Sequence, residues 1–212
     1  MPIIGIDIEK CTNCKQCIRE CPSAIFETDE AEGLVIFNPS KICIYCGHCI
    51  SVCPENAILY KKMKDEALSF DGVQDPSTLI SYEQMYHLIR AKRSIRQYKK
   101  KKVPKEIIKK VINSMRYAPT GANIRQMKCL IISDEEKIKT LSKLIQNELQ
   151  STMPAVYTKS LNDKRAMSID PIFYEAPHII ILYSGSTSDY ANALIAMTYG
   201  MFCAETLGLG TC

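Results

Sequence analysis

Two cysteine runs with the same spacing constrain this chain more than any other feature. The first run is Cys11, Cys14, Cys17 and Cys21, followed by Pro22, and the second is Cys43, Cys46, Cys49 and Cys53, followed by Pro54. Both read C-x2-C-x2-C-x3-C-P. This spacing puts three thiolates on a tight loop and a fourth one helical turn further on, where the proline then ends the helix. Each half is expected to form a strand, a cysteine loop and a short helix.

This spacing predicts two [4Fe–4S] clusters, each taking its fourth ligand from the other run. One cluster is assigned to Cys11, Cys14, Cys17 and Cys53, and the other to Cys21, Cys43, Cys46 and Cys49. A disulfide framework is the first alternative, but no secretory segment precedes the cysteines. A zinc ribbon is the second, but each run offers four thiolates at cluster spacing.

Residues 1–60 resemble the two-cluster bacterial ferredoxins. Short β-prone segments at 3–6, 34–37 and 57–60 suit the small antiparallel strands of that family. A domain of this size buries little apolar surface, so its clusters are expected to stabilise the fold.

The charge is distributed unevenly along the 212 residues, a length that allows one large or two modest domains. Residues 1–60 carry a net charge of −4 and residues 61–212 a net charge of +8. Either the acidic part docks on the basic part, or both are plain solvated surfaces. No helix carries a basic stripe with interleaved aromatics, so no nucleic-acid partner is predicted. No apolar run is long enough for a bilayer and the start lacks a signal-peptide pattern, so we expect a cytoplasmic protein without membrane contact.

A charged, turn-rich connector is predicted over residues 61–81, followed by a second domain over 82–212. Ser81 and Gln84 form a candidate capping box for a helix that runs to about Lys92. Further helices are expected over 103–117, 135–149 and 189–207, the last one buried or at a subunit interface. Buried strands are expected at 129–133 and 178–183, and residues 150–177 are expected to be an irregular loop that shapes an acceptor pocket.

Two sets of reactive side chains in the second domain are given structural interpretations. Cys129, Cys203 and Cys212 are expected to be small buried apolar residues. His48, His87 and His178 have no Ser, Cys or carboxylate partner visible in the sequence, so they are interpreted as structural or surface groups, and no hydrolytic triad is predicted.

Three short motifs stand out from this background of helices and strands. They are Lys92-Arg93-Ser94-Ile-Arg96-Gln-Tyr98, then Ala-Pro119-Thr120-Gly121-Ala-Asn123 with Gln126 beyond, and finally Gly208-Leu-Gly210-Thr-Cys212. Cations and a hydroxyl at a helix end suit a phosphate. A turn with backbone and amide groups suits the polar edge of a flat heterocycle. The run Lys99 to Lys102 is interpreted as solvated charge.

In this order, the three motifs resemble the FMN-dependent nitroreductase family over residues 82–212. The resemblance implies an α+β, three-layer domain that dimerises and holds FMN at the dimer interface. It also implies that Lys92, Arg93 and Ser94 meet the FMN phosphate and that Arg96 approaches the N1/C2=O edge of the flavin. Its implied ring contacts are Pro119, Thr120, Gly121, Asn123 and Gln126, with Gly208 and Gly210 in the last motif. Lys92 stands where arginine is usual, and one extra residue separates Asn123 from Gln126.

The whole chain is therefore interpreted as an α+β ferredoxin–nitroreductase fusion, with domains at 1–60 and 82–212 joined by 61–81. Two clusters would pass electrons to FMN, which would reduce a small flat acceptor such as a nitroaromatic or a quinone. The donor would be reduced ferredoxin, a reductase or NAD(P)H. Alternatives are an electron carrier without flavin, or a dehalogenating or flavin-cleaving enzyme of the same fold. The resemblance also implies a further core strand and arm after Cys212, so the sequence is expected to be a fragment or a shortened natural chain.

Overall fold

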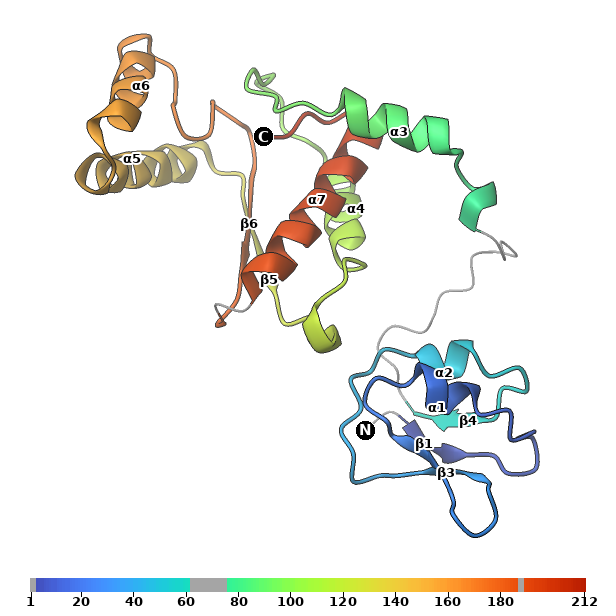
Figure 1. The fold of residues 1–212 in the computed structure, drawn as a ribbon. Coiled ribbons are helices and arrows are strands. Elements are labelled where there is room, and N and C mark those ends of the chain that lie inside the picture. Colours follow the sequence, from blue (N-terminus) through green and yellow to red (C-terminus); the bar gives the residue numbers. More distant parts are fainter. Residues whose placement is uncertain (1–2, 62–75, 187–188) are drawn as a thin grey trace. The chain divides into compact units, whose positions relative to one another are not determined.

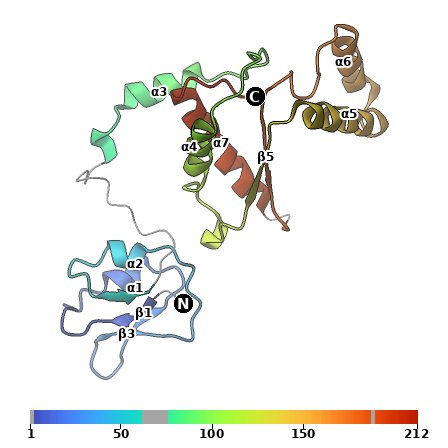
Figure 2. The same cartoon turned by 180° about the vertical axis from the view of Figure 1, so that it is seen from behind.

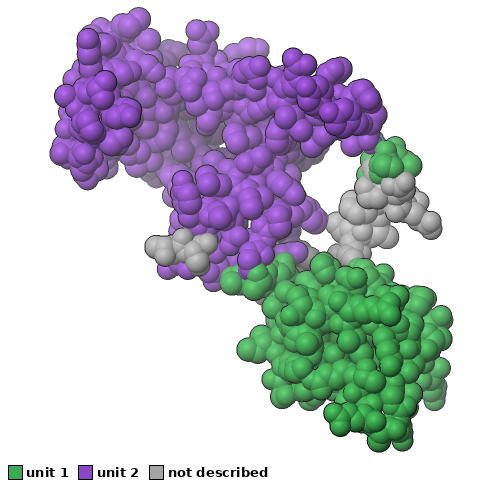
Figure 3. Space-filling model, viewed as in Figure 1, with its two compact units in different colours: residues 1–79, 122–124 green, residues 80–121, 125–212 purple. Residues whose placement is uncertain are grey.

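The computed structural model describes residues 3–61, 76–186 and 189–212. Its contacts divide the chain into two compact units, shown in Figure 3. Unit 1 comprises Met1–Leu79 with Ala122–Ile124, and unit 2 comprises Ile80–Gly121 with Arg125–Cys212. Most of the connector predicted over 61–81 lies outside the described residues. Each unit is described separately below.

Unit 1 contains two short antiparallel strand pairs and two one-turn helices (Figure 1). Strand β1 (Ile3–Ile6) pairs with β4 (Ile58–Tyr60), and β2 (Phe26–Thr28) pairs with β3 (Val35–Phe37). Helix α1 (Gln16–Glu20) follows the first cysteine loop and α2 (His48–Ser51) follows the second. The strands predicted at 3–6, 34–37 and 57–60 are found to within one residue. Strand β2 was not predicted, because three residues are too few to show an alternating pattern.

The two halves of unit 1 repeat the same backbone conformation thirty-two residues apart. Asn13 and Tyr45 have φ values of 56° and 60°, and Ala24 and Asn56 have values of 47° and 50°. Left-handed conformations at matched positions bend each loop around its cysteines in the same way. The core between the halves consists of apolar residues from both, together with two of the cysteines: Ile3, Cys17, Ile25, Phe26, Val35, Cys49 and Ile58.

Unit 2 combines one antiparallel strand pair with five α-helices in the described residues (Figures 1 and 2). Strand β5 (Lys128–Ile132) pairs with β6 (Ile179–Tyr183). The helices are α3 (Tyr82–Ala91), α4 (Lys105–Met115), α5 (Glu135–Thr152), α6 (Ala155–Ala166) and α7 (Tyr190–Thr206). Single turns of 3-10 helix occur at η1 (Pro76–Thr78), which belongs to unit 1, and at η2 (Gly121–Asn123), whose residues are divided between the units.

Local sequence signals explain where the helices of unit 2 begin. The predicted capping box is confirmed at α3, where Ser81 Oγ accepts from Gln84 N at 3.2 Å and Gln84 Oε1 accepts from Ser81 N at 2.9 Å. Asp134 caps α5 by accepting from the backbone N–H of Lys137 at 2.9 Å. These side chains satisfy N–H groups that have no partner inside the helix.

Helices α4 and α7 lie side by side and share a small core with strand β6. Met115, Ala118 and Ala196 are buried there, with Ile180 and Leu182 packed against them. One prediction of burial was wrong, because residues of β5 are mostly exposed, Leu130 by 48%. Helix α7 was expected to be buried or at a subunit interface, and within this chain its Leu194 is exposed by 51%. The apolar composition predicted burial, but within this chain only one stripe of α7 packs against other elements.

The prediction of an irregular loop over residues 150–177 was also wrong, because this segment contains the twelve-residue helix α6. Pro154 was interpreted as loop punctuation, whereas it precedes the first turn, where proline favours a helix start. No helix in the described part of the chain is long and apolar enough to cross a membrane.

Candidate functional site

Each predicted set of four cluster cysteines surrounds one cavity of unit 1. The first cysteine cavity is lined by Cys11, Cys14, Cys17 and Cys53. The second cysteine cavity is lined by Cys21, Cys43, Cys46 and Cys49. The fourth cysteine of each run therefore lines the cavity of the other run, as expected if each cluster takes its fourth ligand from the other run. Among the described residues, no group of three or more His, Cys, Asp or Glu side chains is arranged around one metal ion.

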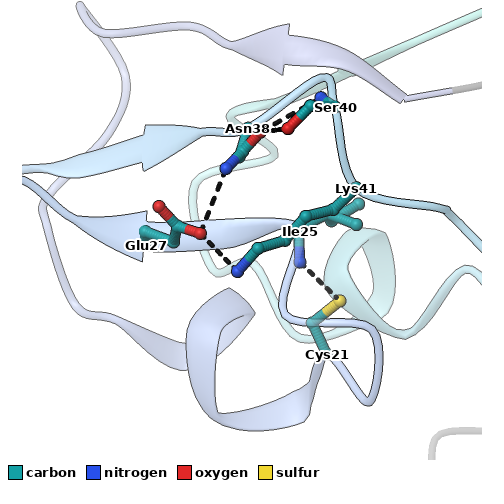
Figure 4. Close-up of polar contacts among 6 residues, drawn as sticks. All are labelled: Cys21, Ile25, Glu27, Asn38, Ser40 and Lys41. Atoms are coloured by element: carbon teal, nitrogen blue, oxygen red, sulfur yellow. Dashed lines mark hydrogen bonds and ion pairs between the residues drawn. The ribbon is translucent and has the colours of Figure 1, made fainter.

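A polar network holds together the two segments that form the second cysteine cavity. Lys41, two residues before Cys43, forms an ion pair with Glu27 on β2, and Asn38 Nδ2 donates to the same carboxylate at 3.2 Å (Figure 4). The hydrogen bonds from Lys41 and Asn38 lower the pKa of Glu27. Because β2 follows Cys21 closely, this network fixes Cys21 relative to Cys43.

Asn13 plays a corresponding role at the first cysteine cavity. Its Nδ2 donates to the carbonyl of Gly33 at 3.0 Å, and its Oδ1 accepts from the backbone N–H of Val35 at 2.9 Å. The side chain thus ties the first cysteine loop to the start of β3. A cysteine loop anchored in this way holds its thiols in place before any metal binds.

Backbone N–H groups are directed at sulfur atoms in both cavities. Ala57 N donates to Cys53 Sγ at 3.2 Å, Ile25 N to Cys21 Sγ at 3.5 Å, and Tyr45 N to Cys43 Sγ at 3.4 Å. Hydrogen bonds of this kind stabilise thiolates and adjust the potential of an iron–sulfur cluster. The donor set therefore fits a cluster in each cavity.

The two most buried cluster cysteines are Cys17 and Cys49, one in each cavity. Burial raises the pKa of Cys17 to about 11 and that of Cys49 to about 12, and the other cysteines of each set add to the shift. Such thiols remain protonated at neutral pH unless bound iron offsets the burial.

In unit 2, the first and third predicted motifs lie against each other. Ile95 N donates to the carbonyl of Thr211 at 3.0 Å, and Lys92 Nζ donates to the same carbonyl at 3.2 Å. Gly210 is required by this contact, because a Cβ there would lie 2.8 Å from Cγ1 of Ile95. Gly208 has φ +71°, a conformation that favours glycine at the end of α7.

The cationic side chains of the first motif rest on backbone carbonyls. Lys92 Nζ also donates to the carbonyl of Arg93 at 2.6 Å, and Arg93 Nη1 donates to the carbonyl of Arg90 at 2.6 Å. Ser94 is exposed beside them. The hydroxyl oxygen of Thr211 is buried and has no hydrogen-bond partner among the described residues. An unsatisfied buried hydroxyl on a residue that Lys92 contacts fits a phosphate-bearing ligand.

The second motif is held by a carboxylate that the sequence did not reveal. Asp189 is 4% exposed, and its Oδ2 accepts from Gln126 Nε2 at 2.8 Å and from Ser184 Oγ. Asn192 Nδ2 donates to Asp189 Oδ1 at 3.0 Å, and Asn192 Oδ1 accepts from Gly121 N at 3.1 Å. The hydrogen bonds from Ser184 and Gln126 lower the pKa of Asp189.

The remaining residues of the second motif are placed as follows. Thr120 Oγ1 accepts from Arg125 N at 3.3 Å, and Pro119 is exposed. Asn123 is assigned by its contacts to unit 1. The roles of these residues toward FMN stay predictions.

Arg96, the predicted neighbour of the flavin edge, lies over an aromatic ring. Its Cζ is 5.6 Å from the ring centroid of Tyr174. Lys164 of α6 stacks on the same ring at 4.4 Å and donates to the Tyr174 hydroxyl at 2.9 Å. Burial raises the pKa of the adjacent Tyr98. Tyr174 therefore joins Arg96 to Lys164 of α6.

The structure adds partners to His178, which was interpreted as a structural or surface group, and it contradicts the predicted burial of the cysteines. His178 does have a serine partner, since its Nδ1 lies 2.7 Å from Ser133 Oγ while its Nε2 accepts from Val103 N at 2.8 Å. Because Nε2 accepts, Nδ1 carries the proton and donates to Ser133, so the histidine does not act as a base toward that hydroxyl. Of the cysteines expected to be buried, Cys129 and Cys212 are exposed and Cys203 is half-buried.

The sequence pattern of the nitroreductase family matches residues 89–212, more than half of the chain. The chain belongs to the nitroreductase family. Unit 1 carries a second match, since residues 10–58 match the 4Fe-4S dicluster domain. This member of the family therefore joins an iron–sulfur module to the nitroreductase domain, as the sequence predicted.

Individual relatives match one domain or the other. An iodotyrosine deiodinase of Thermotoga neapolitana is 24% identical over 132 residues, covering 60% of this chain and 71% of the relative. An uncharacterized ferredoxin of Methanocaldococcus jannaschii is 37% identical over 57 residues, covering 26% of this chain and 89% of the relative. A nitroreductase with bound FMN from Desulfitobacterium hafniense superposes with a TM-score of 0.52 at 17% identity, covering 58% of this chain and 65% of that one. The superposition shows that unit 2 shares the fold.

Proposed function

We propose that this chain is an oxidoreductase that relays electrons through two [4Fe–4S] clusters to FMN and reduces a small flat acceptor such as a nitroaromatic or a quinone. The observation that carries the proposal is the presence of two four-cysteine cavities in a chain that belongs to the nitroreductase family. When bound, the clusters supply single-electron transfer and FMN supplies two-electron reduction of an organic acceptor.

The residues of unit 2 contribute binding and charge. Lys92 and Arg93 would turn from the carbonyls that they now contact toward the FMN phosphate, with the Thr211 hydroxyl as a further partner. Arg96 would place positive charge beside the N1 edge, where negative charge develops on reduction. The network around Asp189 would keep Gly121 in position for the ring. Exposed apolar residues on α7, including Leu194 and Tyr199, support a homodimer.

A second candidate function is reductive dehalogenation of an aromatic substrate. It is favoured by the match to the iodotyrosine deiodinase of Thermotoga neapolitana over 71% of that protein. Reductive loss of a halide and reduction of a nitro group both need a reduced flavin beside a flat ring. The two candidates therefore differ in the acceptor and share the rest of the site.

The test is anaerobic purification with iron, sulfide and flavin quantified per chain. We expect two clusters and FMN that survives desalting. Reduced protein is then offered a nitroaromatic, menadione and 3-iodotyrosine, with oxidation of protein and formation of product both followed. Release of iodide as the fastest reaction favours the second candidate. If the protein contains iron and sulfide but retains no flavin after incubation with FMN, both candidate functions are overturned. The chain would then be an electron carrier.

A further inference from the structure

The two cysteine loops have left-handed backbones at matched positions, and between their first and third cysteines the charge differs at one matched position. Lys15 lies between Cys14 and Cys17, and Gly47 lies between Cys46 and Cys49. Both have left-handed backbones, with φ of 61° for Lys15 and 77° for Gly47. Glycine adopts this conformation freely, whereas a residue with a Cβ is disfavoured there. The lysine therefore occupies the position against its local conformational preference.

Lys15 is among the residues that line one cavity only. It lines the first cysteine cavity and is half-buried, and it forms no ion pair with any residue that the structure describes. No charged residue lines the second cysteine cavity in that part of the chain. The two other lysines closest to cluster cysteines in sequence are neutralised, Lys10 by Asp7 at 3.1 Å and Lys41 by Glu27.

Two features of the cavities oppose the effect that the positive charge of Lys15 would have on a cluster in the first cysteine cavity. Glu55 also lines the first cysteine cavity, but its side chain is exposed, so water and salt screen its charge more strongly. The second cysteine cavity has two N–H···S contacts and the first has one in the described residues, but the single contact is the shortest. We expect both features to change the cluster potential less than Lys15 does, because Lys15 is half-buried and lies between Cys14 and Cys17 in the sequence.

We propose that the cluster held by Cys11, Cys14, Cys17 and Cys53 is the more easily reduced of the two, and that Lys15 sets this difference. The inference rests on the iron–sulfur clusters of the proposed function. In the transfer between clusters, one electron leaves the reduced cluster of the second cavity and enters the oxidised cluster of the first, with no bond or proton exchanged. A nearby positive charge stabilises the extra negative charge of the reduced state.

The test is a redox titration of the full-length holoprotein at one fixed pH for all variants. Both clusters are followed by electron paramagnetic resonance and by the shifted NMR signals of the cysteine β-protons. The variants are Lys15→Gln, which removes the charge, Lys15→Arg, which retains it, and Gly47→Lys, which adds the charge at the matched position. Lys61→Gln removes an exposed charge elsewhere in unit 1 and serves as the control.

We expect two resolved potentials in the natural protein. Lys15→Gln should lower the higher potential and shift the electron distribution between clusters by several-fold up to about tenfold, where tenfold corresponds to about 59 mV for one electron. Gly47→Lys should raise the lower potential, and the Arg and Lys61 variants should change little. Equal potentials in the natural protein, or an unchanged higher potential in Lys15→Gln with full iron content, would overturn the inference. Absence of clusters altogether would instead refute the proposed function.

Discussion

Unit 1 and unit 2 assemble their candidate sites from very different lengths of chain. In unit 1, each cavity takes three cysteines from one short loop and a fourth from the other run. In unit 2, the three predicted motifs are spread from Lys92 to Cys212. The first and third contact each other beyond the end of α7, and the second contacts the start of the same helix. The difference teaches that a site encoded in local spacing can be recognised residue by residue, whereas one built by tertiary packing depends on contacts that spacing does not encode.

The two units also differ in how their cores are built. The buried apolar residues of unit 1 pack together with two of its cysteines, Cys17 and Cys49. The stability of unit 1 therefore depends on what the thiols bind. Unit 2 has a small core of Met115, Ala118 and Ala196, without any predicted metal ligand. The following predictions, from the largest expected effect to the smallest, test whether the two units depend on these separate sources of stability.

The largest effect is expected from Cys21→Ser. Because Cys21 lines the second cysteine cavity, the variant should lose the same cluster as Cys46→Ser and about half of the iron. Iron and sulfide analysis with electron paramagnetic resonance measures this. Cys129→Ser changes an exposed cysteine of unit 2 and should keep all the iron. If Cys21→Ser instead lost the cluster of Cys11, Cys14 and Cys17, the crossing of ligands would be refuted.

A large effect confined to unit 2 is expected from Met115→Ala. Met115 is 8% exposed and packs against α7. The empty space left by the shorter alanine side chain should lower the free energy of unfolding of unit 2 by about 2–5 kcal/mol. Denaturant unfolding followed by circular dichroism measures the loss, and the iron content should not change. The matched control is Met167→Ala, where a side chain that is 69% exposed should contribute within about 0.5 kcal/mol. Loss of iron in Met115→Ala would contradict the separation of the two units.

An intermediate effect is expected from Asp189→Asn. The amide replaces one acceptor oxygen by a donor, which faces the Gln126 amide and the Ser184 hydroxyl. The Gly121 turn should loosen and FMN affinity should fall several-fold, as measured by flavin fluorescence on titration. Asp134→Asn provides the control, because asparagine caps a helix as well as aspartate does. Unchanged FMN affinity would mean that Asp189 does not position the turn.

The smallest effect is a pH dependence that arises from His178. Burial and, to a lesser extent, Lys102 lower its pKa below the ordinary value of 6.5. As the pH falls through this value, the unfolded chain takes up a proton first, so the stability of unit 2 should decline until the folded pKa is reached. Unfolding of His178→Asn should depend less on pH over that window, while exposed His87→Asn should behave like the natural protein. Parallel curves for all three proteins would contradict the assignment.

The sequence predicted the features that depend on neighbouring residues. These include the loop and short helix of each cysteine run, the capping box at Ser81 and most helix and strand positions. It did not predict the roles of Asp189 and His178, because their partners lie up to 75 residues away. Burial of β5 was predicted wrongly, since apolar composition cannot say whether a second layer covers a strand within this chain. Helix α6 was missed because proline both interrupts and begins helices.

The exchange of fourth ligands has a consequence for the order in which the protein matures during translation. The second cysteine cavity is complete once Cys49 has emerged from the ribosome, whereas the first must wait for Cys53, although three of its cysteines are synthesised long before. A nascent chain that ends before residue 53 therefore holds an open triad of thiols beside a finished tetrad. Iron–sulfur assembly on the growing chain would then fill the cavities in the reverse of their order in the sequence.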